Sequence, residues 1–285
     1  MYELVKNFCT CSVSSPLAFW RRPSYSHEGT REKKRLLATN LSDIGFHVHQ
    51  AGDMEALAGK FFELGKRICF GQGAYLHYDA GNGVELWGQL NANDEVIGFN
   101  PHFAGKTRAS AGIMERIARA GFPMDGGFKC LAQPFGTEPI QGSFSFVFDC
   151  PDFLLSAHEQ LPAIRTVQLS AFVQQCATFE NEEEFRSRSA RFGSKLGSDA
   201  FVALGMIDEK RQPRAEPLAT CVIIGHVLEA AQLTNPATSH HFWWLKLRNS
   251  VGEVDVVADP ELLPRGVKPG NVMQCTAWLS GRLTN

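Results

Sequence analysis

Alternating and helical patterns of hydrophobic residues predict a first unit of one strand, one helix and three further strands. The run IGFHVHQ (44–50) alternates apolar and polar positions, as a half-buried strand does. In residues 52–67 apolar side chains recur at helical spacing, with Asp53 placed to cap the helix and Gly65 to end it. GAYLHYD and GVELWGQL, joined by the Gly-rich AGNG, predict a hairpin, and EVIGFN adds a last strand.

The middle of the chain carries shorter strand candidates and one charged helix. GGFKCLAQ and SFSFVFD alternate as strands, while VQLSAFVQQCATF favours a strand over a helix. Asn181 and Glu184 form a capping-box pattern at the start of a predicted helix. Glu182 with Arg186 and Glu184 with Arg188 are favourable i, i+4 pairs, so this charge run is typical of a solvated helix face.

The last third changes to long strand-like runs separated by short polar links. These runs are ATCVIIGHVLEAAQLTN, HFWWLKLR, GEVDVVAD and NVMQCTAWLSGRL. Gly225 within the first run tolerates a sharp bend, which favours a small curled sheet or barrel. The predicted fold class is therefore α+β, mainly antiparallel β. We expect a basic, loosely ordered arm at 1–42, an α+β unit of βαβββ type at 43–160, and a β-rich unit at 161–285 with a barrel at 218–283.

Composition and charge narrow the classes of function. The 285 residues are 44% hydrophobic with a net charge of −2, so the whole chain carries no field that attracts nucleic acid or an anionic membrane. Only the arm is basic, with seven Lys/Arg against three Glu. Eight scattered cysteines lack the spacing of a disulfide framework and predict reduced thiols. No apolar run reaches the roughly 18 residues of a membrane span, so we expect a cytoplasmic protein without a membrane partner.

Four residues of the first unit form a candidate metal site: His47, His49, His77 and Glu85. His47 and His49 would share one side of a strand, and His77 and Glu85 lie on neighbouring predicted strands. Neutral imidazole and carboxylate suit zinc or a non-haem iron or manganese centre, so a divalent metal is the cofactor that this pattern implies. The alternative is that these histidines are hydrogen-bonded packing residues of a half-buried sheet.

Aromatic residues of the last third, Phe242, Trp244 and Trp278, are candidate binding residues. Residues 218–285 carry five Lys/Arg and five Asp/Glu, and this neutrality makes nucleic acid an unfavourable partner. Exposed aromatic residues would instead contact a protein or a small molecule. The chain has no G-x-S-x-G, P-loop, H-E-x-x-H or dinucleotide-binding motif.

Two parts of the chain resemble known families. Residues 44–100, through their element order with GAYLHYD and GVELWGQ, resemble the vicinal-oxygen-chelate (glyoxalase-like) module. That resemblance implies metal ligands at His47 or His49 with His77 or Glu85. Residues 219–283 resemble part of an OB-fold, which implies single-stranded nucleic-acid binding. Runs such as FHVH, FWWLKLR and WLSGRL resemble bacterial proteins of uncharacterised function.

The sequence as a whole favours a soluble, non-catalytic binding or interaction protein, because no specific catalytic constellation accompanies its neutral, aromatic-rich β region. A metal-dependent glyoxalase-like enzyme or metal-gated ligand binder is the first alternative. Single-stranded nucleic-acid binding through the OB-like region is the second. Whether the chain is an enzyme therefore stays open at the level of sequence.

Overall fold

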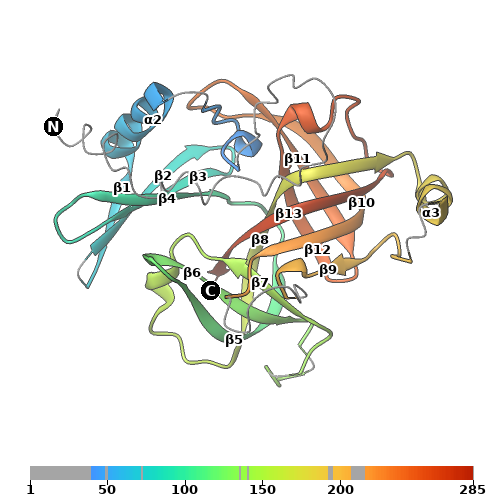
Figure 1. Cartoon of the computed structure of the whole chain (residues 1–285), viewed down its shortest axis with the longest axis horizontal. Coiled ribbons are helices and arrows are strands. Elements are labelled where there is room, and N and C mark those ends of the chain that lie inside the picture. The colour runs from blue at the N-terminus through green and yellow to red at the C-terminus, as the bar shows by residue number, and fades with distance from the viewer. Residues whose placement is uncertain are drawn as a thin grey trace, which may run out of the picture.

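The structure is a computed structural model that describes residues 40–48, 51–71, 73–134, 136–139, 141–191, 195–206 and 216–284. It is mostly β, with a four-stranded antiparallel sheet beside a nine-stranded mixed sheet (Figure 1). Within the described residues there are two α-helices, one against each sheet. The predicted basic arm at 1–42 lies almost entirely outside the described residues.

The four-stranded sheet is a meander in which each strand pairs with the next. Its elements are the 3-10 helix η2 (Ser42–Ile44), the helix α2 (Ala51–Leu64), and the strands β1 (Lys66–Phe70), β2 (Gly73–Gly81), β3 (Val84–Leu90) and β4 (Val96–Phe103). Leu57 and Phe61 on α2 pack against one face of the sheet. Gly88 allows this close approach, because a Cβ there would lie 2.1 Å from the Phe61 ring.

The predicted βαβββ order is not observed, because residues 46–48 do not form a strand. Residues 46–48 lie outside helices and strands, and the order is instead one helix followed by four strands, with β1 the strand that the pattern missed. The backbone at Ile44 and Gly45 is held by side chains of a distant loop: Asn235 Nδ2 donates to Ile44 O (2.8 Å) and Thr238 Oγ1 to Gly45 O (2.7 Å). These bonds replace the pairing that a strand would need.

The nine-stranded sheet contains the rest of the chain. Its strands are β5 (Ala109–Arg119), β6 (Phe122–Ala132), β7 (Ser145–Asp149), β8 (Ala163–Phe179), β9 (Phe201–Val202), β10 (Thr220–Thr234), β11 (His241–Asn249), β12 (Gly252–Ala258) and β13 (Val272–Thr284). The helix α3 (Glu182–Arg191) and the 3-10 helices η3 (Phe153–Ser156), η4 (Leu204–Met206) and η5 (Pro260–Leu262) lie in its connections. β5 to β7 belong to this sheet, so the division at 160 expected from the sequence does not coincide with a change of sheet.

The pairings of β8 and β13 close the nine-stranded sheet into two rings. These two long strands are antiparallel partners from Thr166 opposite Thr284 to Phe179 opposite Val272. One ring runs β8–β13–β10–β11–β12 and returns to β8 through a parallel pairing. The other runs β8–β5–β6–β7–β13. The mostly β content and the antiparallel first sheet thus confirm the coarse fold prediction, while the α+β class and the OB-like barrel stay predictions.

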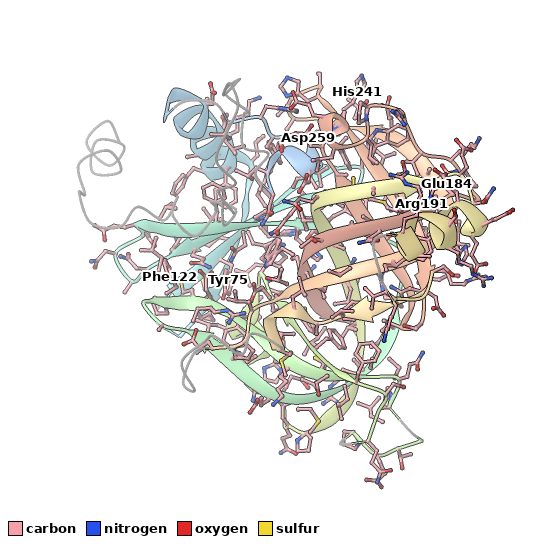
Figure 2. All side chains as sticks on the ribbon, turned by 45° about the vertical axis from the view of Figure 1, so that its right-hand side comes forward. Tyr75, Phe122, Glu184, Arg191, His241 and Asp259 are labelled. Carbon is pink, nitrogen blue, oxygen red and sulfur yellow. The ribbon has the colours of Figure 1, made fainter. Side chains whose placement is uncertain are left out.

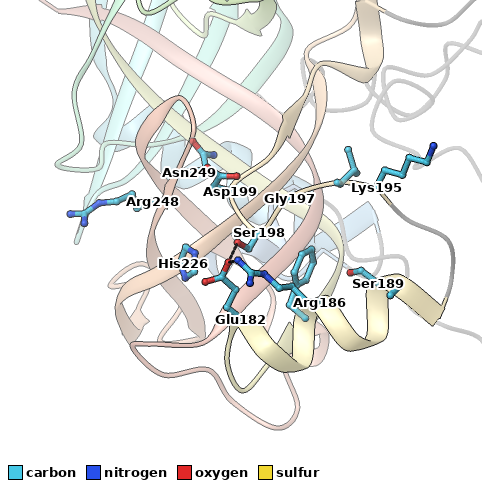
Figure 3. A pocket seen from close by; sticks show the side chains of 13 residues that line it. Glu182, Arg186, Ser189, Lys195, Gly197, Ser198, Asp199, His226, Arg248 and Asn249 are labelled. Carbon is cyan, nitrogen blue, oxygen red and sulfur yellow. Dashed lines mark hydrogen bonds and ion pairs between the residues drawn. The ribbon is translucent and has the colours of Figure 1, made fainter.

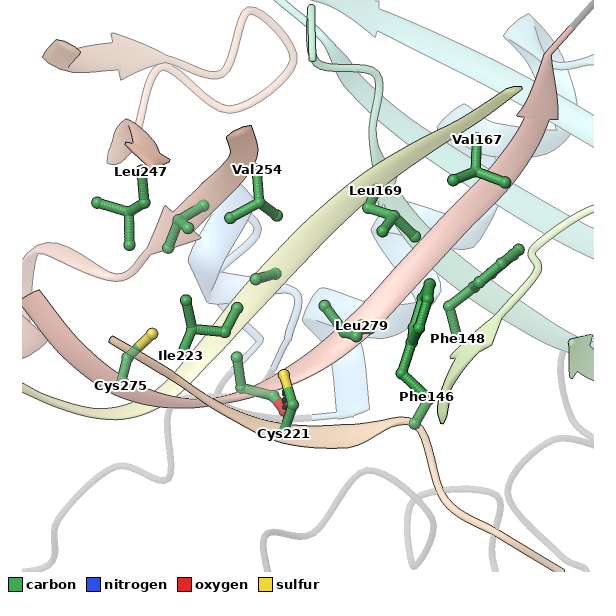
Figure 4. Packing of buried hydrophobic residues seen from close by; sticks show 14 of the residues in the cluster. Phe146, Phe148, Val167, Leu169, Cys221, Ile223, Leu247, Val254, Cys275 and Leu279 are labelled. Carbon is green, nitrogen blue, oxygen red and sulfur yellow. Dashed lines mark hydrogen bonds between the residues drawn. The ribbon is translucent and has the colours of Figure 1, made fainter. Parts of the chain in front are cut away.

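One hydrophobic cluster fills both rings. Figure 4 shows Leu247 and Val254 at one end, Phe146 and Phe148 at the other, and Leu279 between them. A second cluster lies between the two sheets and α2, where Phe172, Phe242 and Val257 of the nine-stranded sheet meet the first sheet. The two sheets therefore share buried surface rather than standing apart.

The N-terminus of α3 is capped as its sequence predicts. Glu184 N donates to Asn181 Oδ1 (2.9 Å), and the ion pairs Glu182–Arg186 (2.6 Å) and Glu184–Arg188 (3.3 Å) form along the helix. Glu184 Oε2 accepts from the backbone of Glu180 (2.7 Å), one residue earlier than in the capping box that we predicted.

Replacing Asn181 with alanine is expected to lower the free energy of unfolding by about 1 kcal/mol, because it removes the side-chain acceptor at the helix N-terminus. Urea unfolding followed by circular dichroism measures the change. Asn181→Asp keeps the acceptor and is expected to stay within about 0.5 kcal/mol of the original chain. Equal losses in the two variants would contradict the capping role.

Candidate functional site

A polar layer is buried between the two sheets, and two of the predicted metal ligands lie in it. We call Glu85, His77, Trp87, Arg282 and Asp152 the interlayer cluster. The first three come from β2 and β3 and share one sheet face, because Trp87 is directly opposite His77 and two residues from Glu85. Arg282 comes from the end of β13 and Asp152 from the turn before η3, both on the other layer.

Contacts within the interlayer cluster use both oxygens of Glu85. His77 Nε2 lies 3.1 Å from Glu85 Oε1, off the direction of a linear hydrogen bond, and Trp87 Nε1 donates to Oε2 (3.0 Å). Arg282 lies with its guanidinium carbon 4.5 Å from the centre of the Trp87 ring and binds Asp152 at 2.8 and 2.9 Å. Arg282 also lies 3.8 Å from Glu85 Oε2, so its guanidinium is shared between the two carboxylates of the cluster.

The charge of Glu85 is strongly favoured. Burial alone would raise its pKa, but the contact with His77, the electrostatic attraction of His102 and the Trp87 indole outweigh burial and hold the pKa at about 2. Glu85 is therefore an anion at neutral pH and acts on its neighbours as a fixed charge. Its side chain is only 8% exposed, so a ligand has little access to it.

A second buried chain of hydrogen bonds crosses the same layer through His102. His102 Nδ1 lies 2.8 Å from Ser280 Oγ, and Nε2 lies 2.7 Å from Gln168 Oε1. Because Gln168 presents its oxygen, His102 donates from Nε2 and accepts from Ser280 at Nδ1. The Gln168 amide in turn donates to Phe103 O (3.2 Å) and to Ser170 Oγ (2.8 Å). Burial lowers the pKa of His102 to about 4, so this ring is neutral at pH 7.

Two half-buried carboxylates, one facing the first sheet and one within the nine-stranded sheet, are hydrogen-bonded as well. Asn100 Nδ2 donates to Asp125 Oδ1 (2.9 Å), and burial raises the pKa of Asp125. Asp149 pairs with Arg119 and accepts from Trp278 Nε1 (2.7 Å). Tyr75 donates its hydroxyl to Met124 O (2.9 Å), and Figure 2 shows Tyr75 beside the end of β6. The polar groups of the layer bind one another and fix the two sheets together.

The four predicted metal ligands are only partly brought together. His77 and Glu85 are in contact, His47 stacks edge-on against His240 with ring centres 4.4 Å apart, and His49 lies outside the described residues. In the part of the chain that the structure describes, no group of three or more His, Cys, Asp or Glu is arranged to hold a metal ion. The other side chains around His77 and Glu85 are Trp87, Arg282 and Asp152 rather than histidines, and the metal site stays a prediction.

The predicted aromatic binding residues lie within the fold. Phe242 is fully buried in the cluster between the sheets. Trp244 and Trp278 are half-buried and donate their indole N–H groups to Asp255 (2.8 Å) and Asp149 (2.7 Å). The polar ends of both indoles thus bind carboxylates of the nine-stranded sheet.

A cavity of ≈ 680 Å³ opens beside α3, far from the interlayer cluster. Figure 3 shows that its walls come from α3, the segment 195–199 and the strands β10 and β11. Glu182, Ser198, His226 and Asn249 form its partly or fully buried floor. Its size is within the range of about 300–1,000 Å³ that is usual for small-molecule sites.

Hydrogen bonds in the cavity leave one carboxylate oxygen open. Arg186 (2.6 Å) and Ser198 (2.8 Å) both donate to Glu182 Oε1. The Ser198 hydroxyl, with smaller contributions from Arg186 and His226, lowers the pKa of Glu182. The carboxylate is therefore ionised, and its Oε2 atom has no hydrogen bond to another described residue.

Comparison with protein-family models, with curated proteins and with solved structures finds no match for this chain. The family resemblances expected from the sequence are therefore not tested by relatives. Within the described residues, no helix combines the length and apolar character needed to cross a membrane.

Proposed function

We propose that this protein is a non-catalytic binding protein that holds a small polar molecule in the cavity beside α3. The cavity itself carries the proposal, because its volume and its polar floor are those of a small-molecule site. The interlayer cluster gives no support to catalysis between the sheets, since Glu85 is almost fully covered and Asp152 binds Arg282. A reacting substrate needs an accessible acid, base or nucleophile.

We further infer that the ring β8–β13–β10–β11–β12 is OB-like. The strand that comes last in the sequence of an OB-fold comes first here, as β8. In an OB-fold the first three strands form a meander, the third lies parallel to the fifth, and the fourth pairs with the first and the fifth. Here β10, β11 and β12 form the meander, β8 is parallel to β12, and β13 pairs with β10 and β8. This order supplies the strand that residues 218–283 lack.

The OB comparison also bears on the alternative functions. OB-folds bind nucleic acid on the face of their second and third strands, which here correspond to β11 and β12. Phe242 and Val257 of those strands pack against the first sheet, so this face is covered. The nucleic-acid alternative thus has less support than the cavity. The glyoxalase-like alternative requires a metal, and the described residues offer only the pair His77 and Glu85.

Replacing Ala190 with tryptophan tests the proposal, because Ala190 is an exposed α3 residue that lines the cavity. A screen of small polar metabolites by thermal shift and ligand-observed NMR is expected to find a ligand that binds one per chain and is recovered unchanged. Ala190→Trp is expected to weaken that binding at least tenfold by filling the cavity.

Ser187→Trp is the matched control, since Ser187 is exposed on the same helix but does not line the cavity. It is expected to bind the ligand as the original chain does. Binding that survives Ala190→Trp, chemical conversion of the ligand, or a screen without any ligand would each overturn the proposal.

A further inference from the structure

The polar groups of the cavity beside α3 are of both charges and roughly balanced. Its cationic side chains are Arg186, Lys195 and Arg248, and its anionic side chains are Glu182 and Asp199. Arg248 is also paired with Glu253 outside the cavity (2.9 Å), which removes most of the excess positive charge. The lining therefore favours neither a simple anion nor a simple cation.

An acceptor for a cationic group is available on the floor. Glu182 is ionised and its Oε1 atom takes both internal hydrogen bonds, which leaves Oε2 for a ligand. Asp199 adds a second carboxylate nearby, on the segment next to Ser198. An ammonium group has three N–H donors and forms charge-assisted bonds with such oxygens.

A donor for an anionic group lies one helical turn away. Arg186 uses one terminal nitrogen for Glu182, and its side chain is 75% exposed, so its other N–H groups are open to a ligand. A guanidinium binds a carboxylate through two parallel N–H bonds. Lys195 lies at the end of the cavity beside α3, where Figure 3 shows it across from Arg248.

We propose that the cavity beside α3 binds a small zwitterion, with the ligand ammonium on Glu182 Oε2 and the ligand carboxylate on Arg186. This chemistry is shared by free amino acids and by the two ends of short peptides. His226 and Asn249 on the floor then contact the part of the ligand between its charges. The inference rests on the proposed function, because it names the ligand of the same cavity.

Isothermal titration and NMR with the twenty free amino acids and a set of dipeptides such as Ala-Ala test the inference. At least one of these probes is expected to bind, and the stronger class identifies the source of the ligand. N-acetylation of the best probe removes its positive charge, and amidation of its carboxylate removes its negative charge. Each modification is expected to weaken binding at least tenfold.

Two pairs of variants connect each charge with its residue. Glu182→Gln is expected to weaken binding of the zwitterion about tenfold and to leave the weak binding of the N-acetyl form unchanged, whereas Glu183→Gln, next along α3 and outside the cavity, has no effect. Arg186→Gln is expected to weaken binding of the zwitterion about tenfold and to leave the weak binding of the amidated form unchanged. Arg188→Gln, on the same helix and outside the cavity, is its control.

The outcomes separate this inference from the proposed function. Equal binding of the zwitterion and its N-acetyl or amidated form, or unchanged binding by Glu182→Gln, would overturn the inference. The inference also fails if no amino acid or dipeptide binds but another metabolite binds and loses affinity in Ala190→Trp. In that case the proposed function stands. If neither the probes nor the wider screen yield a ligand, both fail.

Discussion

Replacing Asp255 with alanine is expected to lower the free energy of unfolding by about 3 kcal/mol, because it leaves buried donors without an acceptor. Asp255 is fully buried on β12. It accepts hydrogen bonds from Thr107 N (2.9 Å), Thr107 Oγ1 (2.6 Å) and Trp244 Nε1 (2.8 Å). Two of these donors cannot turn toward another partner.

The position of Asp255 explains why the effect is large. Thr107 lies in the connection between β4 and β5, the point where the chain passes from the first sheet to the second. Gly105 in that connection lies so close that an added Cβ would be 2.0 Å from Asp255 Oδ2. One carboxylate thus fixes the crossing segment and the Trp244 indole together.

Urea unfolding of Asp255→Ala measures the effect, and Glu253→Ala on the same strand is the control. Glu253 is partly exposed and pairs with Arg248 on the surface, so its loss is expected to cost at most about 1 kcal/mol. A loss below about 1 kcal/mol in Asp255→Ala would show that water or a rearranged loop replaces the carboxylate.

Hydrophobic alternation predicted most strands but missed β1, β5 and the two-residue β9. The runs that became β2, β3, β7, β12 and β13 alternate or are continuously apolar because at least one of their faces is buried. β1 is the edge of its sheet and largely exposed, so it carries little pattern. Residues 46–48 belong to an alternating run without being a strand, because buried Phe46 packs in the core while loop side chains hold the preceding backbone.

The candidate sites differ in how far sequence could predict them. His77 and Glu85 were paired correctly because both lie on neighbouring strands of one hairpin, where face and register follow from local pattern. The partners Arg282 and Asp152 lie far along the chain and carry no local signal. The cavity beside α3 was missed for the same reason, since its lining joins residues of α3 and of the segment 195–199 with His226 and Arg248.

Lowering the pH from 7 to 4 is expected to destabilise the protein by up to about 3 kcal/mol through His102 alone. The pKa of His102 is lowered to about 4 by burial, against an ordinary value of 6.5. Below pH 6.5 His102 binds a proton in the unfolded chain but stays neutral in the folded chain, so the free energy of unfolding falls until about pH 4. Below pH 4 this contribution no longer changes.

Glu85 adds a second loss in a separate range of pH. Its pKa of about 2 lies below the ordinary 4.5, so the stability that its charge contributes is present above pH 4.5 and is lost between pH 4.5 and 2. Asp125 acts in the opposite direction, because burial raises its pKa and its protonation therefore favours the folded state in acid. The range from pH 6.5 to 4.5 is thus the clearest test of His102.

Urea unfolding at half-unit steps from pH 7.5 to 4.5 separates the contribution of His102 from those of the other groups. His102→Gln is expected to be less stable at pH 7, since it disturbs the bonds to Ser280 and Gln168, yet to show a shallower fall in stability below pH 6.5. His158→Gln, whose side chain is 80% exposed, is expected to follow the original curve. Parallel curves for His102→Gln and the original chain would mean that protonation of the buried ring does not lower the free energy of unfolding. The layer between the sheets would then have to open to water before the protein unfolds.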